Sequence, residues 1–149
     1  MLDSNATVSL IKTHNNAKLP VFAHNTDACG DLYSVEEVVV PPNKIKCVDI
    51  GWKLGGISDP DWQLRIFCRS GYGKRGILIP NGVGIVDSGY RGSIGVLLYN
   101  STDEDYVVHP GDRVAQISLE KVYRPHFTVI EEEEALPSDR DGGFGSTGV

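Results

Sequence analysis

The chain has 149 residues, a net charge of −6 and 40% hydrophobic residues, which suits one domain with a full apolar core. The acidic balance argues against a nucleic-acid polymer as partner, because such a partner requires a basic face. No apolar run approaches the length of a membrane span, and the first residues lack the basic and apolar regions of a signal peptide. We therefore expect a cytoplasmic protein, of a bacterium or of a virus-infected host, without a membrane partner.

The cysteines and histidines argue against a zinc site. Cys29, Cys47 and Cys68 are widely spaced, with no CxxC pair, and the four histidines are scattered. An odd number of such cysteines predicts reduced thiols, which agrees with a cytoplasmic compartment.

Short runs rich in Val, Ile and aromatic residues recur along the chain, separated by clusters of turn-forming residues. They predict strands at 7–12, 35–40, 44–50, 62–68, 76–79, 82–86, 93–100, 113–122 and 126–131. Only residues 70–76 could hold a turn of helix. About ten short strands at regular spacing indicate an all-β sandwich or barrel.

The end of the chain differs in composition from the rest. Four glutamates at 131–134 precede a segment rich in glycine. We interpret the glutamates as the solvated end of a strand, and the residues after Pro137 as too rich in glycine to order alone. The sequence therefore predicts a single β domain over 1–137 and a flexible arm over 138–149.

Two loops in the first half of the chain suit an anion. In "TDACGDLYS" (26–34), Asp31 lies among small residues, where backbone can approach a ligand. Taken alone, this segment favours the alternative of a plain turn capped by Asp31. In "RSGYG" (69–73), Arg69 offers a forked cation, Ser70 a hydroxyl and Gly71 exposed N–H groups. A strand followed by such a turn makes an anion nest or an ordinary turn.

The segment "PNGVGIVDSGYRG" (80–92) reads as a hairpin that suits a planar base. Glycines at 82 and 84 leave backbone groups open to a ligand edge, and Asn81 can both donate and accept. Asp87 is a candidate general base and Tyr90 a ring that could stack on a sugar. The alternative is a hairpin with a capping Asp87 and a core Tyr90.

The last of these loops is "HPGDRVAQ" (109–116). We expect Asp112 and Arg113 to form a structural ion pair at the start of a strand. Gln116 lies among apolar residues, so it needs a polar partner if it is buried.

Taken in order, these segments resemble the five motifs of the trimeric deoxyuridine triphosphatase (dUTPase) family. The matching stretches are "DACGDLYS" (27–34), "RSGYG" (69–73), "NGVGIVDSGYRG" (81–92), "GDRVAQ" (111–116) and "RDGGFGSTG" (140–148). The resemblance implies a jelly-roll-like fold, a homotrimer with active sites at subunit interfaces, and Mg²⁺ on the triphosphate. The implied activity splits dUTP into dUMP and pyrophosphate, which limits uracil in DNA and supplies dUMP for thymidylate synthesis.

The resemblance also implies a role for each matching residue. Asp31 matches the aspartate that holds the metal through water, and Asp87 matches the aspartate that activates the attacking water. Gln116 matches the glutamine near the phosphates and the water shell. The remaining implied contacts are to the phosphates (Arg69, Ser70, Gly71), to uracil (Asn81, Gly84, Ile85, Val86), to deoxyribose (Tyr90), and from the closing arm to base and phosphates (Arg140, Phe144, Gly145, Ser146, Thr147).

Three positions depart from the family pattern. Cys29 stands where the first motif usually has glycine, and Cys68 where the second usually has proline. Arg140 stands four residues before Phe144, whereas the family arginine commonly stands five before it.

The sequence also allows functions other than hydrolysis of dUTP to be compared with its motifs. A dCTP deaminase resembles this family but uses a glutamate ten residues after the motif-three aspartate, where this chain has Leu97. An apolar side chain cannot carry protons, which argues against deamination. A non-catalytic trimer that senses nucleotides, and a purely structural trimer, are the remaining alternatives.

Overall fold

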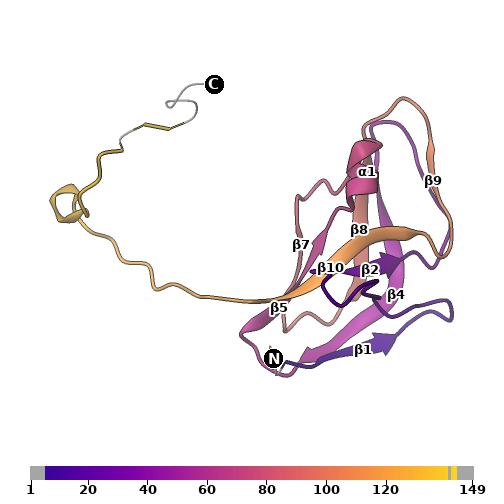
Figure 1. Ribbon diagram of the computed structural model, residues 1–149, viewed down its shortest axis with the longest axis horizontal. Coiled ribbons are helices and arrows are strands. Elements are labelled where there is room, and N and C mark those ends of the chain that lie inside the picture. Colours follow the sequence, from indigo (N-terminus) through magenta and orange to yellow (C-terminus); the bar gives the residue numbers. More distant parts are fainter. Residues whose placement is uncertain (1–5, 141, 144–149) are drawn as a thin grey trace.

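The computed structural model describes residues 6–140, 142 and 143, which form an almost entirely β structure (Figure 1). The strands are β1 (Val8–Lys12), β2 (Gly30–Tyr33), β3 (Val38–Val40), β4 (Ile45–Ile57), β5 (Trp62–Phe67), β6 (Ile77–Leu78), β7 (Gly84–Val86), β8 (Ser93–Asn100), β9 (Tyr106–Val108) and β10 (Arg113–Lys121). The helical segments are α1 (Ser70–Lys74) and the 3₁₀ turn η1 (Glu132–Glu134). Within the described part of the chain, no helix has the length and hydrophobicity to cross a bilayer.

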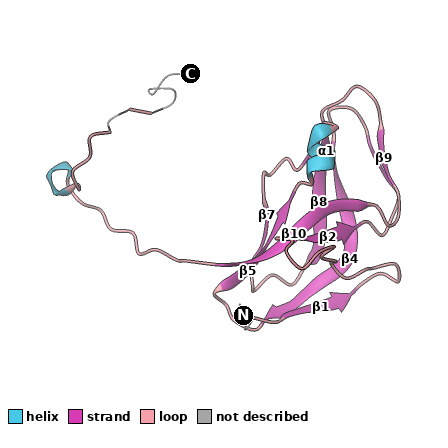
Figure 2. Cartoon of the chain, viewed as in Figure 1, coloured by secondary structure: helices cyan, strands magenta, loops and turns pink. Residues whose placement is uncertain are grey.

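The strands form two four-stranded antiparallel sheets and one two-stranded ribbon. The first sheet has the order β1-β4-β8-β6, the second β2-β10-β5-β7, and β3 pairs with β9. Figure 2 shows that strands build nearly the whole body and that α1 lies at one end of it. The prediction of an all-β, jelly-roll-like fold is confirmed, as is the single turn of helix within 70–76.

The core follows the period-2 pattern of the sequence. In β8, Ile94, Val96 and Leu98 are buried while the residues between them are more exposed. In β5 the buried side chains are Leu64 and Ile66. Burial of one face of each strand is the main source of stability, because each fully buried aliphatic side chain contributes roughly 1.5–3 kcal/mol.

β4 is longer than the predicted strand at 44–50, because it continues past a break in its pairing. The register with β8 shifts between Asp49 and Lys53, and Gly51 lies there with a φ of 79°. A Cβ at Gly51 would lie 2.7 Å from the Cβ of Ala17 and 2.8 Å from Cγ1 of Val35. Only glycine meets both the backbone and the space requirement, so the strand bends here without ending.

Two strands were not predicted. β2 lies within the loop interpreted as a ligand-binding turn, and β9 follows the acidic turn at 101–105. Both are short, with four and three residues, and both form by pairing with a distant strand, β10 for β2 and β3 for β9. Local composition does not report such pairing.

The predicted strand at 126–131 is wrong. The chain leaves the body after β10 and runs outward (Figure 1), and every side chain from 123 to 140 is exposed. Phe127 and Val129 are residue types that are common in strands, but no strand of the described chain pairs with them. The four glutamates are likewise no strand end, because Glu132–Glu134 form η1, closed by a capping box between Glu131 and Glu134.

Asn100 ties the end of β8 to the ribbon and to the turn before β9. It is completely buried, and its Nδ2 donates to the carbonyl oxygens of Val40 at 2.8 Å and Glu104 at 2.7 Å. Its Oδ1 accepts from the backbone N–H and the hydroxyl of Thr102, at 2.9 and 2.8 Å. A single side chain thus satisfies four polar groups in the interior.

Replacing Asn100 with alanine should lower the free energy of unfolding by about 3 kcal/mol, because buried polar groups lose their partners. Urea unfolding followed by circular dichroism measures this. Asn16→Ala, at an exposed position, is the matched control and should change stability by less than about 0.5 kcal/mol. Coincident curves for the two variants would contradict the role of Asn100.

Candidate functional site

Asp31, Arg69, Ser70 and Gln116 gather around one cavity of about 450 Å³. Asp31 lies on β2, Gln116 on β10, and Arg69 and Ser70 follow β5. The strand pairing brings them together, because Gln116 lies opposite Asp31 on one side and Phe67 on the other. The sheet register therefore unites residues that are far apart in sequence.

Asp31 is held by arginine side chains. The Nε of Arg69 donates to its Oδ1 at 2.9 Å, and Nη1 of Arg113 lies 3.6 Å from its Oδ2. The side chain of Asp31 is only 18% exposed, so the pair with Arg69 is better shielded from water than a surface salt bridge. The shorter contact fixes the guanidinium of Arg69 at the cavity wall.

The predicted ion pair between Asp112 and Arg113 is wrong. Arg113 faces Asp31 instead, while Oδ2 of Asp112 accepts from the backbone N–H of His109 at 2.8 Å and closes the turn. Arg113 is thus a residue of the cavity that sequence reasoning assigned to structure. Arg113 meets Asp31 because β10 pairs with β2, and the sequence around Arg113 does not reveal that pairing.

Gln116 connects β10 to the turn that carries Arg69. Its Nε2 donates to the carbonyl oxygen of Cys68 at 3.0 Å. The Sγ of Cys68 lies 3.4 Å from the carbonyl oxygens of both Arg69 and Ile77, so the thiol bridges the two ends of this segment. Burial raises the pKa of Cys68 and of Cys29, which also lines the cavity, and both therefore stay neutral thiols at pH 7.

This cavity suits a phosphate chain. The guanidinium groups of Arg69 and Arg113 face the carboxylate of Asp31, and the hydroxyl of Ser70 adds a donor. Asp27 lines the cavity as a second carboxylate. Arginine binds phosphate oxygens through paired N–H groups, and Asp31 presents hard oxygen atoms of the kind that Mg²⁺ prefers. The cavity therefore combines groups for an anion with a carboxylate for its counter-ion.

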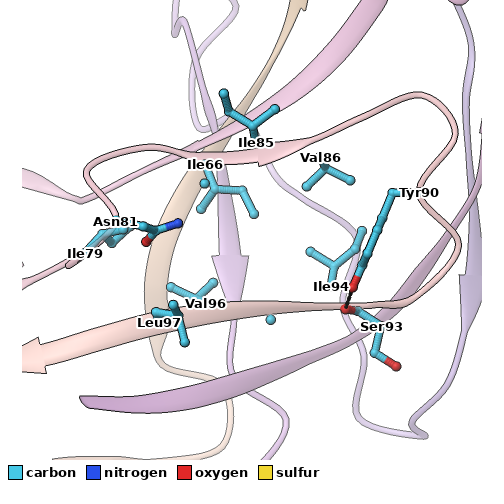
Figure 3. Close-up of a pocket in the computed structure, with 12 residues that line it drawn as sticks. Ile66, Ile79, Asn81, Ile85, Val86, Tyr90, Ser93, Ile94, Val96 and Leu97 are labelled. Carbon is cyan, nitrogen blue, oxygen red and sulfur yellow. Dashed lines mark hydrogen bonds between the residues drawn. The ribbon is translucent and has the colours of Figure 1, made fainter. Parts of the chain in front are cut away.

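The predicted base-reading residues line a second cavity, of about 240 Å³, between the 80–92 hairpin and β8. Asn81, Gly84, Ile85, Val86 and Tyr90 all belong to it. Figure 3 shows Asn81 and Tyr90 at opposite ends of the gap, with apolar side chains of the hairpin above and of β8 below. Apolar walls with an amide at one end are typical of a pocket for a flat, polar-edged ring.

The ring of Tyr90 is fixed by two neighbours. Its hydroxyl donates to the carbonyl oxygen of Ser93 at 2.9 Å (Figure 3). Gly92 lies against the ring, because a Cβ there would lie 2.7 Å from Cζ of Tyr90. Sequence reasoning did not single out Gly92, whose importance appears only from the packing. At the other end of the hairpin, a Cβ on Gly84 would lie 3.1 Å from Cβ of Ile66, so the strands approach closely there.

Asp87 follows directly after β7 and is exposed to solvent. It is not among the residues that line the second cavity, although the preceding Val86 is. Its backbone carbonyl accepts from the N–H of Tyr90 at 3.0 Å, which closes the turn and leaves the carboxylate at the rim.

The two cavities share no lining residue, and Asp31 of the first and Gly84 of the second lie at opposite edges of one sheet. Asp31 is on β2 and Gly84 on β7, with β10 and β5 between them. Three strand spacings separate those edges by about 14 Å. One chain thus holds the predicted site as two separate groups.

The remaining predicted residues lie elsewhere. Gly71 lines a third cavity, beside Arg69. Arg140 is exposed on the segment that runs away from the body (Figure 1). The positions of Phe144, Gly145, Ser146 and Thr147 lie outside the described residues.

The chain is similar in sequence to known proteins of one family. The chain is 37% identical over 143 residues to the deoxyuridine 5'-triphosphate nucleotidohydrolase of Helicobacter pylori, covering 95% of this chain and 97% of that protein. It is 40% identical over 142 residues to the protein of the same name from Clostridium novyi, covering 93% and 96%.

Solved structures agree on the fold. The dUTPase of Staphylococcus bacteriophage 80alpha, described with dUPNHPP, has a TM-score of 0.82 at 25% identity, covering 96% of this chain and 99% of that one. A mutant dUTPase of phage phi11 of S. aureus, described as coordinating a structural Mg(II) ion, has a TM-score of 0.74 at 23% identity, covering 87% and 99%. A dUTPase family model matches residues 15–148, and with these relatives it shows that the chain belongs to the dUTPase family.

Proposed function

We propose that this chain hydrolyses dUTP to dUMP and pyrophosphate, thereby limiting uracil incorporation into DNA and supplying dUMP for thymidylate synthesis. Family membership supports the activity, and the observation that carries it is the pair of complementary cavities. One offers guanidinium groups and a carboxylate, the other an apolar slot with an amide. A nucleoside triphosphate needs both.

The phosphate chain binds in the cavity of Asp31, Arg69, Ser70 and Gln116, with Gly71 at its margin. The guanidinium of Arg69 is held in place by Asp31 at 2.9 Å and therefore needs no rearrangement to meet the phosphates. Preorganised charge of this kind usually accounts for much of the rate enhancement in phosphoryl transfer.

Uracil binds in the slot of the hairpin, where the backbone from Gly84 to Val86 and the amide of Asn81 read its polar edge. The ring of Tyr90 supports the deoxyribose. Leu97 also lines this cavity, so the slot lacks a carboxylate at the position where a deaminase carries its glutamate.

The two groups meet when the phosphate cavity of one copy faces the hairpin slot of another. The separation of about 14 Å between the edge strands of Asp31 and Gly84 supports a site that one chain does not complete alone. A homotrimer with one site at each interface brings every slot to a phosphate cavity. In this proposal the site is complete only in the trimer, because an isolated chain holds the two halves apart.

Catalysis is hydrolysis by attack of water on the α-phosphorus. The carboxylate of Asp87 takes a proton from the water as the new O–P bond forms, and the bond from the α-phosphorus to the bridging oxygen breaks. Pyrophosphate leaves with the electron pair of that bond. General-base assistance contributes roughly 10²–10⁴-fold, and positioning by Arg69, Gln116 and the hairpin supplies most of the remainder.

Mg²⁺ fits the chemistry of the phosphate cavity. The donors there are the hard oxygen atoms of Asp31 and of the substrate phosphates, and Asp31 would hold the ion through water. When bound, the ion neutralises charge on the triphosphate. Arg69 and Arg113 supply the protein's own positive charge beside it.

The arm, residues 138–149, closes over the bound nucleotide, with Phe144 over the base and Gly145, Ser146 and Thr147 beside the phosphates. Arg140 adds a cation. Glycines in this segment let backbone N–H groups approach phosphate oxygens without side-chain clash. The arm belongs functionally to the site, whereas residues 1–137 form the β domain that carries it.

We assign the protein to the cytoplasm of a bacterium or an infected cell. Its three cysteines are free thiols, two of them beside the segment that binds phosphate. Free thiols persist in a reducing compartment. The nucleotide substrate is also found there.

Asp87→Asn should retain dUTP binding and lose turnover by roughly 10²–10⁴-fold, because an amide cannot accept the proton. Titration with a non-hydrolysable dUTP analogue measures binding, and coupled detection of pyrophosphate measures turnover, with dUTP, dCTP and UTP compared side by side. Asp103→Asn, at an exposed turn position, is the control and should match the wild type. An Asp87→Asn variant with most of its kcat would exclude this base.

Gly92→Ala should displace the ring of Tyr90, because the new methyl group would lie 2.7 Å from its Cζ. The site should then discriminate less against ribose, so that the ratio of kcat/KM for UTP to that for dUTP rises about tenfold. Gly89→Ala is matched, because a Cβ at Gly89 meets nothing within 4 Å. Equal ratios in both variants would refute the role of the Tyr90 ring.

Deletion of residues 138–149 should leave the fold intact and reduce kcat/KM sharply, by about 10²-fold or more, since closure excludes water and adds phosphate contacts. Thermal unfolding and size-exclusion chromatography check that the truncated protein folds and assembles. Full activity of a well-folded truncation would disprove closure by the arm.

A further inference from the structure

A third cavity, of about 280 Å³, adjoins the phosphate cavity and has no role in the proposed reaction. Arg69 and Arg113 line both cavities, so the two lie on either side of one pair of guanidinium groups. The other residues of the third cavity are Gly71, Tyr72, Arg75, Tyr106 and Asp112.

Positive charge dominates this cavity. It contains three arginines and one carboxylate. The carboxylate of Asp112 already accepts the N–H of His109 at 2.8 Å, and Arg69 uses only its Nε, at 2.9 Å, for Asp31. The Nη groups of Arg69 and the guanidinium of Arg75 make no hydrogen bond with any residue that the structure describes. The cavity therefore has donors for an anion, and Asp31, which pairs with Arg69 and Arg113 from the neighbouring cavity, leaves an excess of one positive charge.

Tyr72 forms part of the wall of this cavity. The side chain is 6% exposed, and its hydroxyl is shielded from solvent. The ring of Tyr106 packs edge-on against it at 5.4 Å. Tyr72 therefore shapes the cavity, whereas the arginines supply the groups that can contact an anion.

Space is available beside these groups. A Cβ at Gly71 would meet nothing within 4 Å, so the backbone of the turn is open on the side of the cavity.

We infer that this third cavity is a second anion subsite, which binds inorganic pyrophosphate through Arg69, Arg75 and Arg113. The inference rests on the proposed function, in which pyrophosphate is the leaving group. Because Arg69 and Arg113 face both cavities, pyrophosphate passes from the first to the second without losing its two guanidinium partners. The subsite thus clears the phosphate cavity while the product is still bound.

Arg75→Gln tests the subsite, because Arg75 lines the third cavity and not the phosphate cavity. The variant should weaken binding of pyrophosphate to the full-length protein about tenfold, the effect of one lost charge-assisted hydrogen bond, with KM for dUTP changed less than about twofold. Isothermal titration measures pyrophosphate binding directly. Lys74→Gln, an adjacent cation outside the cavity, is the matched control and should bind pyrophosphate as the wild type does.

Titration with inorganic phosphate shows whether the cavity binds pyrophosphate or single phosphate ions. If binding of phosphate but not of pyrophosphate depends on Arg75, the assignment to pyrophosphate is wrong. If neither depends on Arg75, there is no subsite. These titrations need no turnover, so loss of the subsite is distinguishable from failure of the proposed hydrolysis, which the release assay with dUTP reports separately.

Discussion

The contact between Asp31 and Arg69 is the constraint on which the candidate site depends. At 2.9 Å it joins a short strand that forms only by pairing with β10 to the turn that follows β5. Gln116 reinforces the same connection from the strand between them, through the carbonyl oxygen of Cys68. The partly buried pair orients the guanidinium before any ligand arrives, and orientation of charge in advance is what makes an electrostatic site effective.

The same sheet that assembles the phosphate cavity keeps the base slot away from it. Strands β10 and β5 lie between Asp31 and the hairpin, and their spacing is set by backbone hydrogen bonds. No side chain rearrangement removes that separation. The rigid sheet therefore fixes the distance between Asp31 and the hairpin within one chain.

Much of this was predictable from the sequence, and the failures have physical causes. Alternation of apolar residues predicted most strands and the fold class, and the glycine-rich turns indicated both cavities. Strand β2 and the partner of Arg113 were missed, because pairing between distant strands decides them. The strand prediction at 126–131 failed for the opposite reason. The segment has residues typical of strands, but no strand edge of the described chain is available to pair with it. The role of Gly92 depends on its close contact with the ring of Tyr90, and the sequence gives no sign of that contact.

A chain of net negative charge that binds a polyanion must concentrate cations at the binding site. Arg69 and Arg113 line two cavities each, so one pair of guanidinium groups contributes to both. Sharing them limits how tightly either cavity holds its anion, since a bidentate arginine cannot serve two phosphate groups fully at once. That limit suits a site that must bind a triphosphate and then release part of it, and it explains why positive charge is concentrated around α1 in a protein whose net charge is −6.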